Sequence, residues 1–107
     1  MKYWFFTIHK TPKRDELTTE QVLPILHAHT AYFKQLGAAG KCLMAGPFAD
    51  QTTTLGAGCY VLICDTEEQA RELADADPFV IEGIYEYKII EWMKVVPLSE
   101  PPAVAGG

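Results

Sequence analysis

Two residues of this chain combine a side chain suited to proton transfer with an inward position in the predicted fold: His29 and Asp77. On a helical wheel of about 100° per residue, His29 lies in the middle of an apolar stripe. The stripe is formed by Val22, Ile25, Leu26, Phe33 and Leu36. A histidine titrates near neutral pH and can act as a general acid or base. The alternative is a core histidine whose ring nitrogens are bonded to backbone carbonyls.

Asp77 lies seven residues after Ala70, so it returns to the inward face of a second predicted helix, at its C-terminal end. The helix dipole disfavours a carboxylate there. The alternative role is capping, because Asp followed by Pro is a favoured N-cap and N1 pair for a short turn over residues 78–83. The two roles are compatible, because one carboxylate oxygen can cap while the other orients an imidazole.

If both helices pack on the same face of the sheet, His29 and Asp77 can meet near the loop that follows Gly46, Pro47 and Phe48. The carboxylate would then fix the tautomer of the imidazole and raise its basicity. No Ser or Cys nucleophile is placed beside this pair in the sequence. Proton transfer is the chemistry that remains.

The cysteines do not suggest a second kind of site. Cys42, Cys59 and Cys64 are odd in number, with no C-x-x-C pair and no His at ligand spacing, so neither a disulfide framework nor a zinc site is expected. Cys42 and Cys59 lie in apolar segments without basic neighbours, which disfavours a nucleophilic role. We expect no metal and no organic cofactor.

Four apolar segments are expected to form the strands that position these residues: 3–8, 41–48, 59–64 and 86–96. The first is aromatic and β-branched without polar interruption, as in a strand covered on both faces. In the last, the alternation slips at Ile89 and Ile90, which indicates either a bulge or contacts on both faces.

The first helix is marked by a capping-box spacing, Thr18 with Gln21. Pro24 complicates its start: either regular helix begins near Leu23, with Pro24 in the first turn, or the helix kinks there. The glycines of residues 37–40 are expected to end it.

The second helix repeats the capping-box spacing, with Thr66 and Gln69. It should stop at Asp77 and Pro78, because Pro disfavours helical geometry in the residue before it. Residues 79–83 are expected to add one further turn.

The resulting order is βαββαβ, an α+β ferredoxin-like fold with a four-stranded antiparallel sheet and two helices on one face. The other face needs a cover, and in so short a chain the simplest cover is a second copy, hence a homodimer. We expect residues 1–96 to form one domain. Residues 97–107 are rich in Pro, Gly and Ala and are expected to be either disordered or packed on the partner subunit.

Composition limits the possible partners. Of the 107 residues 49% are apolar and 21% are charged, which is typical of a single globular domain. The net charge of −5 disfavours nucleic acid and anionic membranes as partners. The apolar start, residues 3–8, is too short for a signal peptide or a membrane span, and reduced thiols fit the cytoplasm, where we expect the protein to act.

Four segments, taken in order, resemble the YCII-related (YciI-like) family over about residues 1–96. They are His29 to Phe33, Gly40 with Lys41, Ala45 to Phe48, and Ala74 to Val80 with Gly83. The resemblance implies a dimeric α+β barrel, two ferredoxin-like units facing each other through their sheets, with an active site containing a His–Asp pair. The matching positions here are His29 and Asp77.

The family is structurally similar to muconolactone isomerases, and at least one relative eliminates chloride from a chlorinated hydroxyquinol. This chain departs from the family pattern in the polar segment 11–19, in the tail after Pro97 and in the extra His27.

We therefore expect an enzyme that moves protons on a small cyclic or enolisable molecule, in an isomerase or lyase-like step, with His29 as acid-base group and Asp77 as its orienter. The candidates for an apolar substrate pocket, the aromatic ones equally candidates for the core, are Tyr3, Phe5, Gly46, Pro47, Phe48, Phe79 and Tyr85. The competing hypothesis is a non-catalytic dimeric module that binds a small ligand or another protein, in which His29 is structural.

Overall fold

The computed structural model describes residues 1–97. Its elements, in chain order, are β1 (Lys2–Lys10), α1 (Pro12–Asp15), α2 (Thr19–Ala38), β2 (Cys42–Pro47), β3 (Gly58–Cys64), α3 (Glu67–Asp75), α4 (Pro78–Ile81) and β4 (Tyr85–Trp92). Of the tail expected over residues 97–107, all but Pro97 lies outside the described residues.

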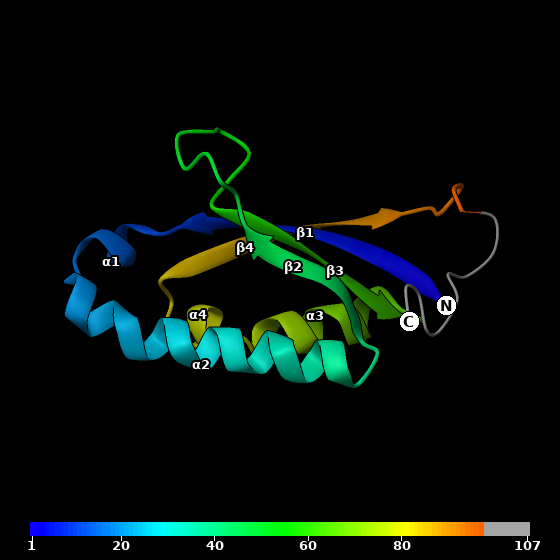
Figure 1. Cartoon of the computed structure of the whole chain (residues 1–107), viewed down its shortest axis with the longest axis horizontal. Coiled ribbons are helices and arrows are strands. Elements are labelled where there is room, and N and C mark those ends of the chain that lie inside the picture. Colours follow the sequence, from blue (N-terminus) through cyan, green and yellow to red (C-terminus); the bar gives the residue numbers. More distant parts are fainter. Residues whose placement is uncertain (98–107) are drawn as a thin grey trace, which may run out of the picture.

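The strands form one antiparallel sheet in the order β2-β3-β1-β4. Helices α2, α3 and α4 lie beneath one face of it, as Figure 1 shows. The α+β fold class and the βαββαβ order predicted from the sequence are confirmed. Helix α4 forms where one further turn was expected, and the short helix α1 is added.

Helix α2 begins earlier than one reading of the sequence placed it. The predicted capping box forms: the Gln21 backbone N–H donates to Thr18 Oγ1, and the Thr18 N–H donates to the Gln21 side chain. The helix therefore runs from Thr19, and Pro24 lies inside it. Pro24 has no N–H for the Glu20 carbonyl, and both residues lie on the exposed side of the helix, where water can serve as the partner instead. Gly40, with φ of +73°, follows the helix end as expected.

Helix α1 was not predicted, because its segment is polar and rich in turn residues. Pro12 occupies its first turn, and Thr11 is its N-cap. Thr11 also donates from its backbone N–H to the Ile84 carbonyl at 3.1 Å and from Oγ1 to the Gly83 carbonyl at 2.6 Å. These two bonds tie the start of α1 to the segment that leads into β4.

Strand β4 is shorter than the predicted 86–96 and has no bulge. It pairs with β1 without a register shift, from Lys10 with Tyr85 to Tyr3 with Trp92. Because β1 begins at Lys2, little partner strand remains beyond Trp92. Of the two explanations for the slipped alternation, contact on both faces fits: Ile89 packs on the core and Ile90 lies on the other face, 66% exposed. The sheet's register shift is instead in β2, between Cys42 and Met44.

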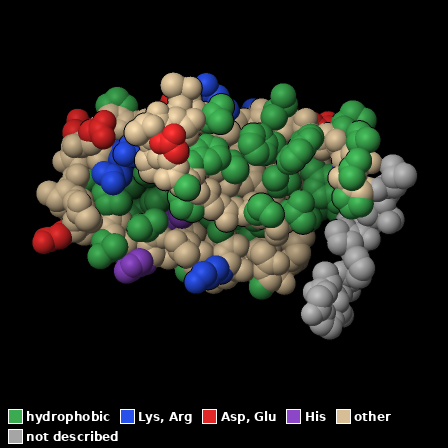
Figure 2. Space-filling view, turned by 45° about the horizontal axis from the view of Figure 1, so that its top comes forward, with side chains coloured by type: hydrophobic (Ala, Val, Ile, Leu, Met, Phe, Trp, Pro, Cys, Tyr) green, Lys and Arg blue, Asp and Glu red, His purple; other side chains and the backbone are tan. Residues whose placement is uncertain are grey.

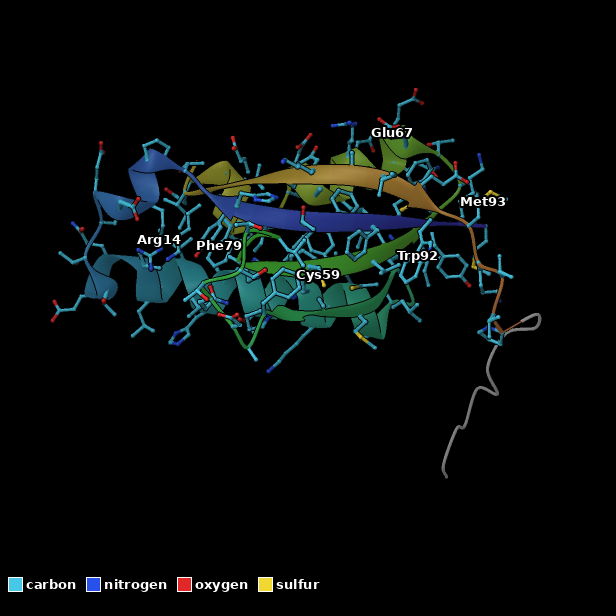
Figure 3. All side chains as sticks on the ribbon, turned by 90° about the horizontal axis from the view of Figure 1, so that it is seen from above. Arg14, Cys59, Glu67, Phe79, Trp92 and Met93 are labelled. Atoms are coloured by element: carbon cyan, nitrogen blue, oxygen red, sulfur yellow. The ribbon has the colours of Figure 1, made fainter. Side chains whose placement is uncertain are left out.

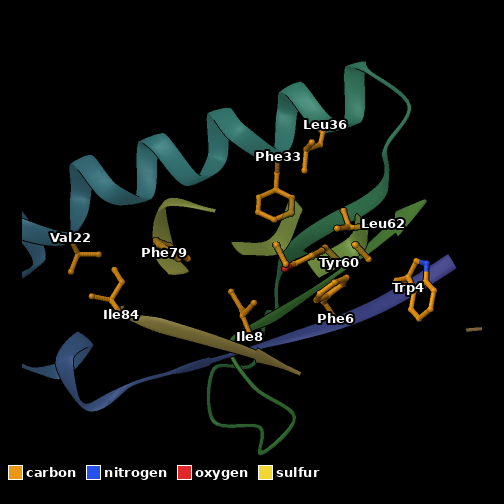
Figure 4. Packing of buried hydrophobic residues seen from close by; sticks show 12 residues of the cluster. Trp4, Phe6, Ile8, Val22, Phe33, Leu36, Tyr60, Leu62, Phe79 and Ile84 are labelled. Atoms are coloured by element: carbon orange, nitrogen blue, oxygen red, sulfur yellow. The ribbon is translucent and has the colours of Figure 1, made fainter. Parts of the chain in front are cut away.

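The core lies between the sheet and the helices (Figure 4). Alternation along β1 directs Trp4, Phe6 and Ile8 toward the helices, where all three are buried. The other buried apolar residues of this cluster are Val22, Phe33, Leu36, Tyr60, Leu62, Ala70, Ala74, Phe79 and Ile84.

The opposite face of the sheet carries apolar side chains that no element within residues 1–97 covers. By strand alternation and pairing, this open sheet face consists of Tyr3, Phe5, Met44, Val61, Ile63, Ile90 and Trp92. Figure 2 turns this side forward and shows hydrophobic side chains gathered over the sheet. The rings of Phe5 and Trp92 meet edge to face at 5.8 Å, and Trp92 lies with Met93 at the end of β4 (Figure 3). No helix within residues 1–97 has both the length and the hydropathy of a membrane span.

Candidate active site

The structure brings His29 and Asp77 together. Nδ1 of His29 lies 2.7 Å from Oδ1 of Asp77. His29 comes from the middle of α2, and Asp77 is the N-cap of α4. Asp77 is completely buried, whereas the His29 side chain keeps 18% of its surface exposed. A buried carboxylate is therefore paired with an imidazole that remains reachable.

One oxygen of Asp77 both caps and orients. The backbone N–H of Phe79 donates to Oδ1 at 3.0 Å, and this is the oxygen that faces His29. The sequence had suggested one oxygen for each task. Instead, Oδ2 is buried with no hydrogen-bond partner among the described residues. Local sequence explains the placement, because Asp followed by Pro starts a short helix, and the N–H of its second residue, Phe79, donates to this carboxylate.

Aromatic rings hold the imidazole in place. The Phe79 ring stacks on His29 with centroids 3.8 Å apart and planes 13° apart. The ring of Phe33, one turn further along α2, is tilted relative to the imidazole, and the two ring centroids lie 4.9 Å apart. With Asp77 ionised, Nδ1 carries the proton that it donates to Oδ1, and Nε2 of the neutral imidazole keeps its lone pair. Nε2 has no hydrogen-bond partner among residues 1–97.

His29 forms part of the wall of a pocket of about 760 Å³ between α2 and β2. Five of the pocket residues expected from the sequence line it: Gly46, Pro47, Phe48, Phe79 and Tyr85. Tyr3 and Phe5 do not, because strand alternation puts them on the open sheet face.

Other lining residues were not among the sequence-based pocket candidates, and they include Phe33, Lys34, Cys42, Gln51 and Tyr60. Phe33 could have been found, since it lies four residues after His29 on the same helical face. Tyr60 could not, because its strand is apolar at every position and gives no sign of which face points inward.

The electrostatics of the pocket favour neutral or anionic ligands. Among residues 1–97, Lys34 is the one Lys or Arg that lines the pocket, and no Asp or Glu of this range lines it. Burial, and after it the charge of Asp77, raises the pKa of Tyr60 far above its usual value, so its hydroxyl stays protonated. Burial also raises the pKa of the Cys42 thiol, which disfavours a thiolate nucleophile. Within residues 1–97 no group of three or more His, Cys, Asp or Glu side chains could hold a metal ion.

Comparison with protein families gives a match over almost all of the described chain. A family model, the YCII-related domain, matches residues 3–93. YciI of Escherichia coli O6:H1 (strain CFT073) is 34% identical over 97 residues, which cover 85% of this chain and 97% of that protein. YjpA of Bacillus subtilis (strain 168) is 39% identical over 64 residues, 60% of this chain and 71% of YjpA.

A solved structure shares the fold. It is the 5-chloro-2-hydroxyhydroquinone dehydrochlorinase of Burkholderia phenoliruptrix AC1100, in complex with 2,5-dihydroxybenzoquinone. The TM-score is 0.61 at 17% identity, covering 87% of this chain and 94% of the other. At that identity the likeness shows the fold alone.

Proposed function

The chain belongs to the YCII-related family, and we propose that it is an enzyme that transfers protons on a small cyclic or enolisable compound, in an isomerase or lyase-like step. One observation carries the proposal: the 2.7 Å contact between His29 Nδ1 and Asp77 Oδ1, made by an imidazole that lines a pocket. A histidine so oriented is a general acid or base with one nitrogen free for a ligand.

The two residues have distinct roles in this proposal. Asp77 is a positioning residue: it holds the proton on Nδ1 and stabilises the imidazolium that forms when Nε2 accepts a proton. His29 is the catalytic residue, removing a proton from one atom of the substrate and returning it to another atom or to a leaving group. Stacking on Phe79 keeps the ring in a single orientation.

The pocket supports a ring-shaped substrate. Its walls carry the aromatic side chains of Phe33, Phe48, Phe79 and Tyr85. Such walls favour flat apolar rings, and no carboxylate within residues 1–97 lines the pocket to repel the oxygens of such a ring. The structural neighbour is a dehydrochlorinase of a hydroxylated chlorinated ring, which is consistent with an elimination of this kind.

A His29 that was sealed and bonded to backbone would favour the non-catalytic module. Its Nδ1 is bonded to a carboxylate, and its ring is partly exposed at the pocket, which supports the enzyme instead.

The working form in this proposal is a homodimer of the domain formed by residues 1–96. The open sheet face supports it, because contiguous apolar surface of this kind is uncommon on a free monomer. A second copy, facing the first through its own sheet, is the occupant we propose. Among the described residues the three cysteines are free thiols, which fits action in the cytoplasm.

The test is a ligand screen followed by turnover. Purified protein is screened by thermal shift against small lactones, halogenated phenols and hydroxyquinones, including 2,5-dihydroxybenzoquinone, because a ligand that binds only the native state raises its melting temperature. Compounds that stabilise the protein are then assayed for isomerisation or elimination with wild type and His29→Ala. Turnover that is lost with His29 supports the proposal, and turnover that persists without His29 refutes it.

A further inference from the structure

Tyr60 has a hydroxyl group that the fold leaves without a partner. The residue is 3% exposed, and its oxygen is buried without a hydrogen bond to any of residues 1–97. Buried hydroxyls are nearly always paired, since an unpaired one lowers stability. Tyr60 is also one of the residues that line the pocket beside His29. An unpaired buried donor at a pocket wall is a candidate ligand-binding group.

Neighbouring rings hold the ring of Tyr60 in place. Phe6 stacks on Tyr60 with centroids 4.6 Å apart and planes 15° apart. Phe33 packs at 4.5 Å from Tyr60, so that Tyr60 lies between the two phenylalanines (Figure 4). The ring of Phe33 is in turn 4.9 Å from that of His29. Tyr60, Phe33 and His29 thus follow one another along the pocket wall, with the rings of Tyr60 and His29 both packed against that of Phe33.

We propose that the Tyr60 hydroxyl donates a hydrogen bond to an oxygen of the substrate, a carbonyl, enolate or phenolate oxygen on a small ring, and so sets the position of that ring relative to His29. This inference rests on the proposed function and names the substrate group that the site recognises.

The polarity of the site agrees with a bound acceptor. Because burial and the charge of Asp77 keep Tyr60 protonated, its hydroxyl has a hydrogen to give. Lys34 adds a second donor among the lining residues, and within residues 1–97 no lining carboxylate competes for either. An anionic or carbonyl oxygen therefore meets two donors from this part of the chain.

The hydrogen bond would also assist the chemistry. When His29 Nε2 takes a proton from the carbon next to a carbonyl, the electron pair of the C–H bond moves into the ring and negative charge collects on the carbonyl oxygen. A donor already placed at that oxygen stabilises the charge as it develops. Tyr60 would then be a second catalytic residue, since it touches the reacting group.

The experiment compares Tyr60→Phe with a matched control, Tyr32→Phe. Tyr32 also has a partly buried hydroxyl near Asp77, but it donates to the Leu73 carbonyl at 2.6 Å and does not line the pocket. The probe is 2,5-dihydroxybenzoquinone, with affinity measured by calorimetry and stability by urea unfolding. A tyrosine ¹³C label at Cζ reports hydrogen bonding at each phenolic oxygen by NMR.

We expect Tyr60→Phe to be at least as stable as wild type, because it removes an unpaired hydroxyl, and to bind the quinone about 5- to 10-fold more weakly. Tyr32→Phe should lose stability and keep its affinity. The Cζ signal assigned to Tyr60 should shift on quinone binding in the wild type. Equal affinity in wild type and Tyr60→Phe, an unmoved Tyr60 signal, or no binding of the quinone by the wild type would each overturn the inference.

A third variant separates this inference from the proposed function. If His29→Ala still binds the quinone in a Tyr60-dependent way while no compound is turned over by the wild type, Tyr60 is a ligand-binding group and the enzyme proposal fails. If turnover depends on His29 and is the same in Tyr60→Phe, the enzyme proposal stands and the role of Tyr60 is refuted.

Discussion

Nδ1 of His29 lies 2.7 Å from Oδ1 of Asp77, and that same oxygen accepts the N–H of Phe79 at 3.0 Å. A single carboxylate oxygen therefore joins the middle of α2 to the start of α4 across 48 residues of sequence. Folding of the Asp–Pro turn fixes the carboxylate, and the carboxylate fixes the imidazole. The geometry of the site is in this way a consequence of a helix cap.

Replacing His29 by Ala should abolish most turnover and leave the fold intact. Loss of a general acid or base lowers kcat by about 100- to 10,000-fold. His27→Ala is the control, because His27 lies on the same helix with an exposed side chain. Steady-state kinetics and circular dichroism of both variants check the prediction. Comparable kcat values for the two variants would contradict a catalytic role for His29.

Asp77 can be tested with a pair of substitutions that separate its two roles. Asn is as good an N-cap as Asp, so Asp77→Asn should keep stability within about 1 kcal/mol while losing the charge that stabilises the imidazolium, and kcat should fall at least about 10-fold. Asp77→Ala should show the same fall in kcat and should also lose about 1 kcal/mol or more of unfolding free energy, since the Phe79 N–H then has no acceptor. Urea unfolding and kinetics give both quantities. An Asn variant with full activity would show that Asp77 is a cap and nothing else.

Local signals in the sequence predicted much of the fold. Thr18 and Gln21, like Thr66 and Gln69, form the reciprocal bonds that their spacing predicted, because a capping box involves only residues within one helical turn. The element bounds that were predicted wrongly, or not predicted at all, depend on contacts with distant segments of the chain. The end of β4 is set by where its partner β1 begins, and helix α1 is held by bonds from Thr11 to residues far along the chain.

The residues of the candidate site likewise fall into those that local sequence could predict and those that it could not. The pairing of His29 with Asp77 could be anticipated, because the place of His29 follows from helical periodicity, that of Asp77 from the Asp–Pro cap signal, and the helices they belong to cover one sheet face. The placement of Tyr3, Phe5 and Tyr60 could not. In strands that are apolar at successive positions, which alternate side faces the helices is decided by packing of the whole sheet.

The proposed dimer can be disrupted at the open sheet face. Ile90 is 66% exposed on that face, and Ile81, 67% exposed, belongs to α4 on the helical side of the sheet. Ile90→Glu should yield monomers, because a charge buried between two sheets is not compensated there, whereas Ile81→Glu should stay dimeric. Light scattering coupled to size-exclusion chromatography measures the mass of each variant. A monomeric wild type, or a dimeric Ile90→Glu, would argue against the sheet as the interface.

The Cys42 thiol should react slowly near neutral pH. Burial is the largest influence on this group and raises its pKa, whereas backbone hydrogen bonds at Met44 and Val61 act in the opposite direction and are outweighed. In a variant carrying Cys59→Ser and Cys64→Ser, the rate of alkylation by iodoacetamide should rise with pH through a midpoint above that of a free cysteine peptide. Because Cys42 lines the pocket, a bound ligand should slow the reaction further. A midpoint at or below the peptide value would refute the prediction.

Tyr60 should make the fold sensitive to alkaline pH. Its pKa in the folded protein is raised, chiefly by burial, above the value of about 10 expected in the unfolded chain. Above that value the unfolded state releases a proton that the folded state retains, so the free energy of unfolding falls with pH, by up to about 1.4 kcal/mol per unit. Tyr32 and Tyr87 also have raised pKa values, but they are present in both wild type and Tyr60→Phe and cancel in the comparison.

The measurement is urea unfolding of wild type and Tyr60→Phe at a fixed protein concentration from pH 8 to pH 11. The difference between their free energies of unfolding should be constant below about pH 10 and should shift in favour of Tyr60→Phe above it. Parallel curves across that range would mean that the Tyr60 hydroxyl ionises in the folded protein as it does in the unfolded chain, and it would then not be the buried donor that the site requires.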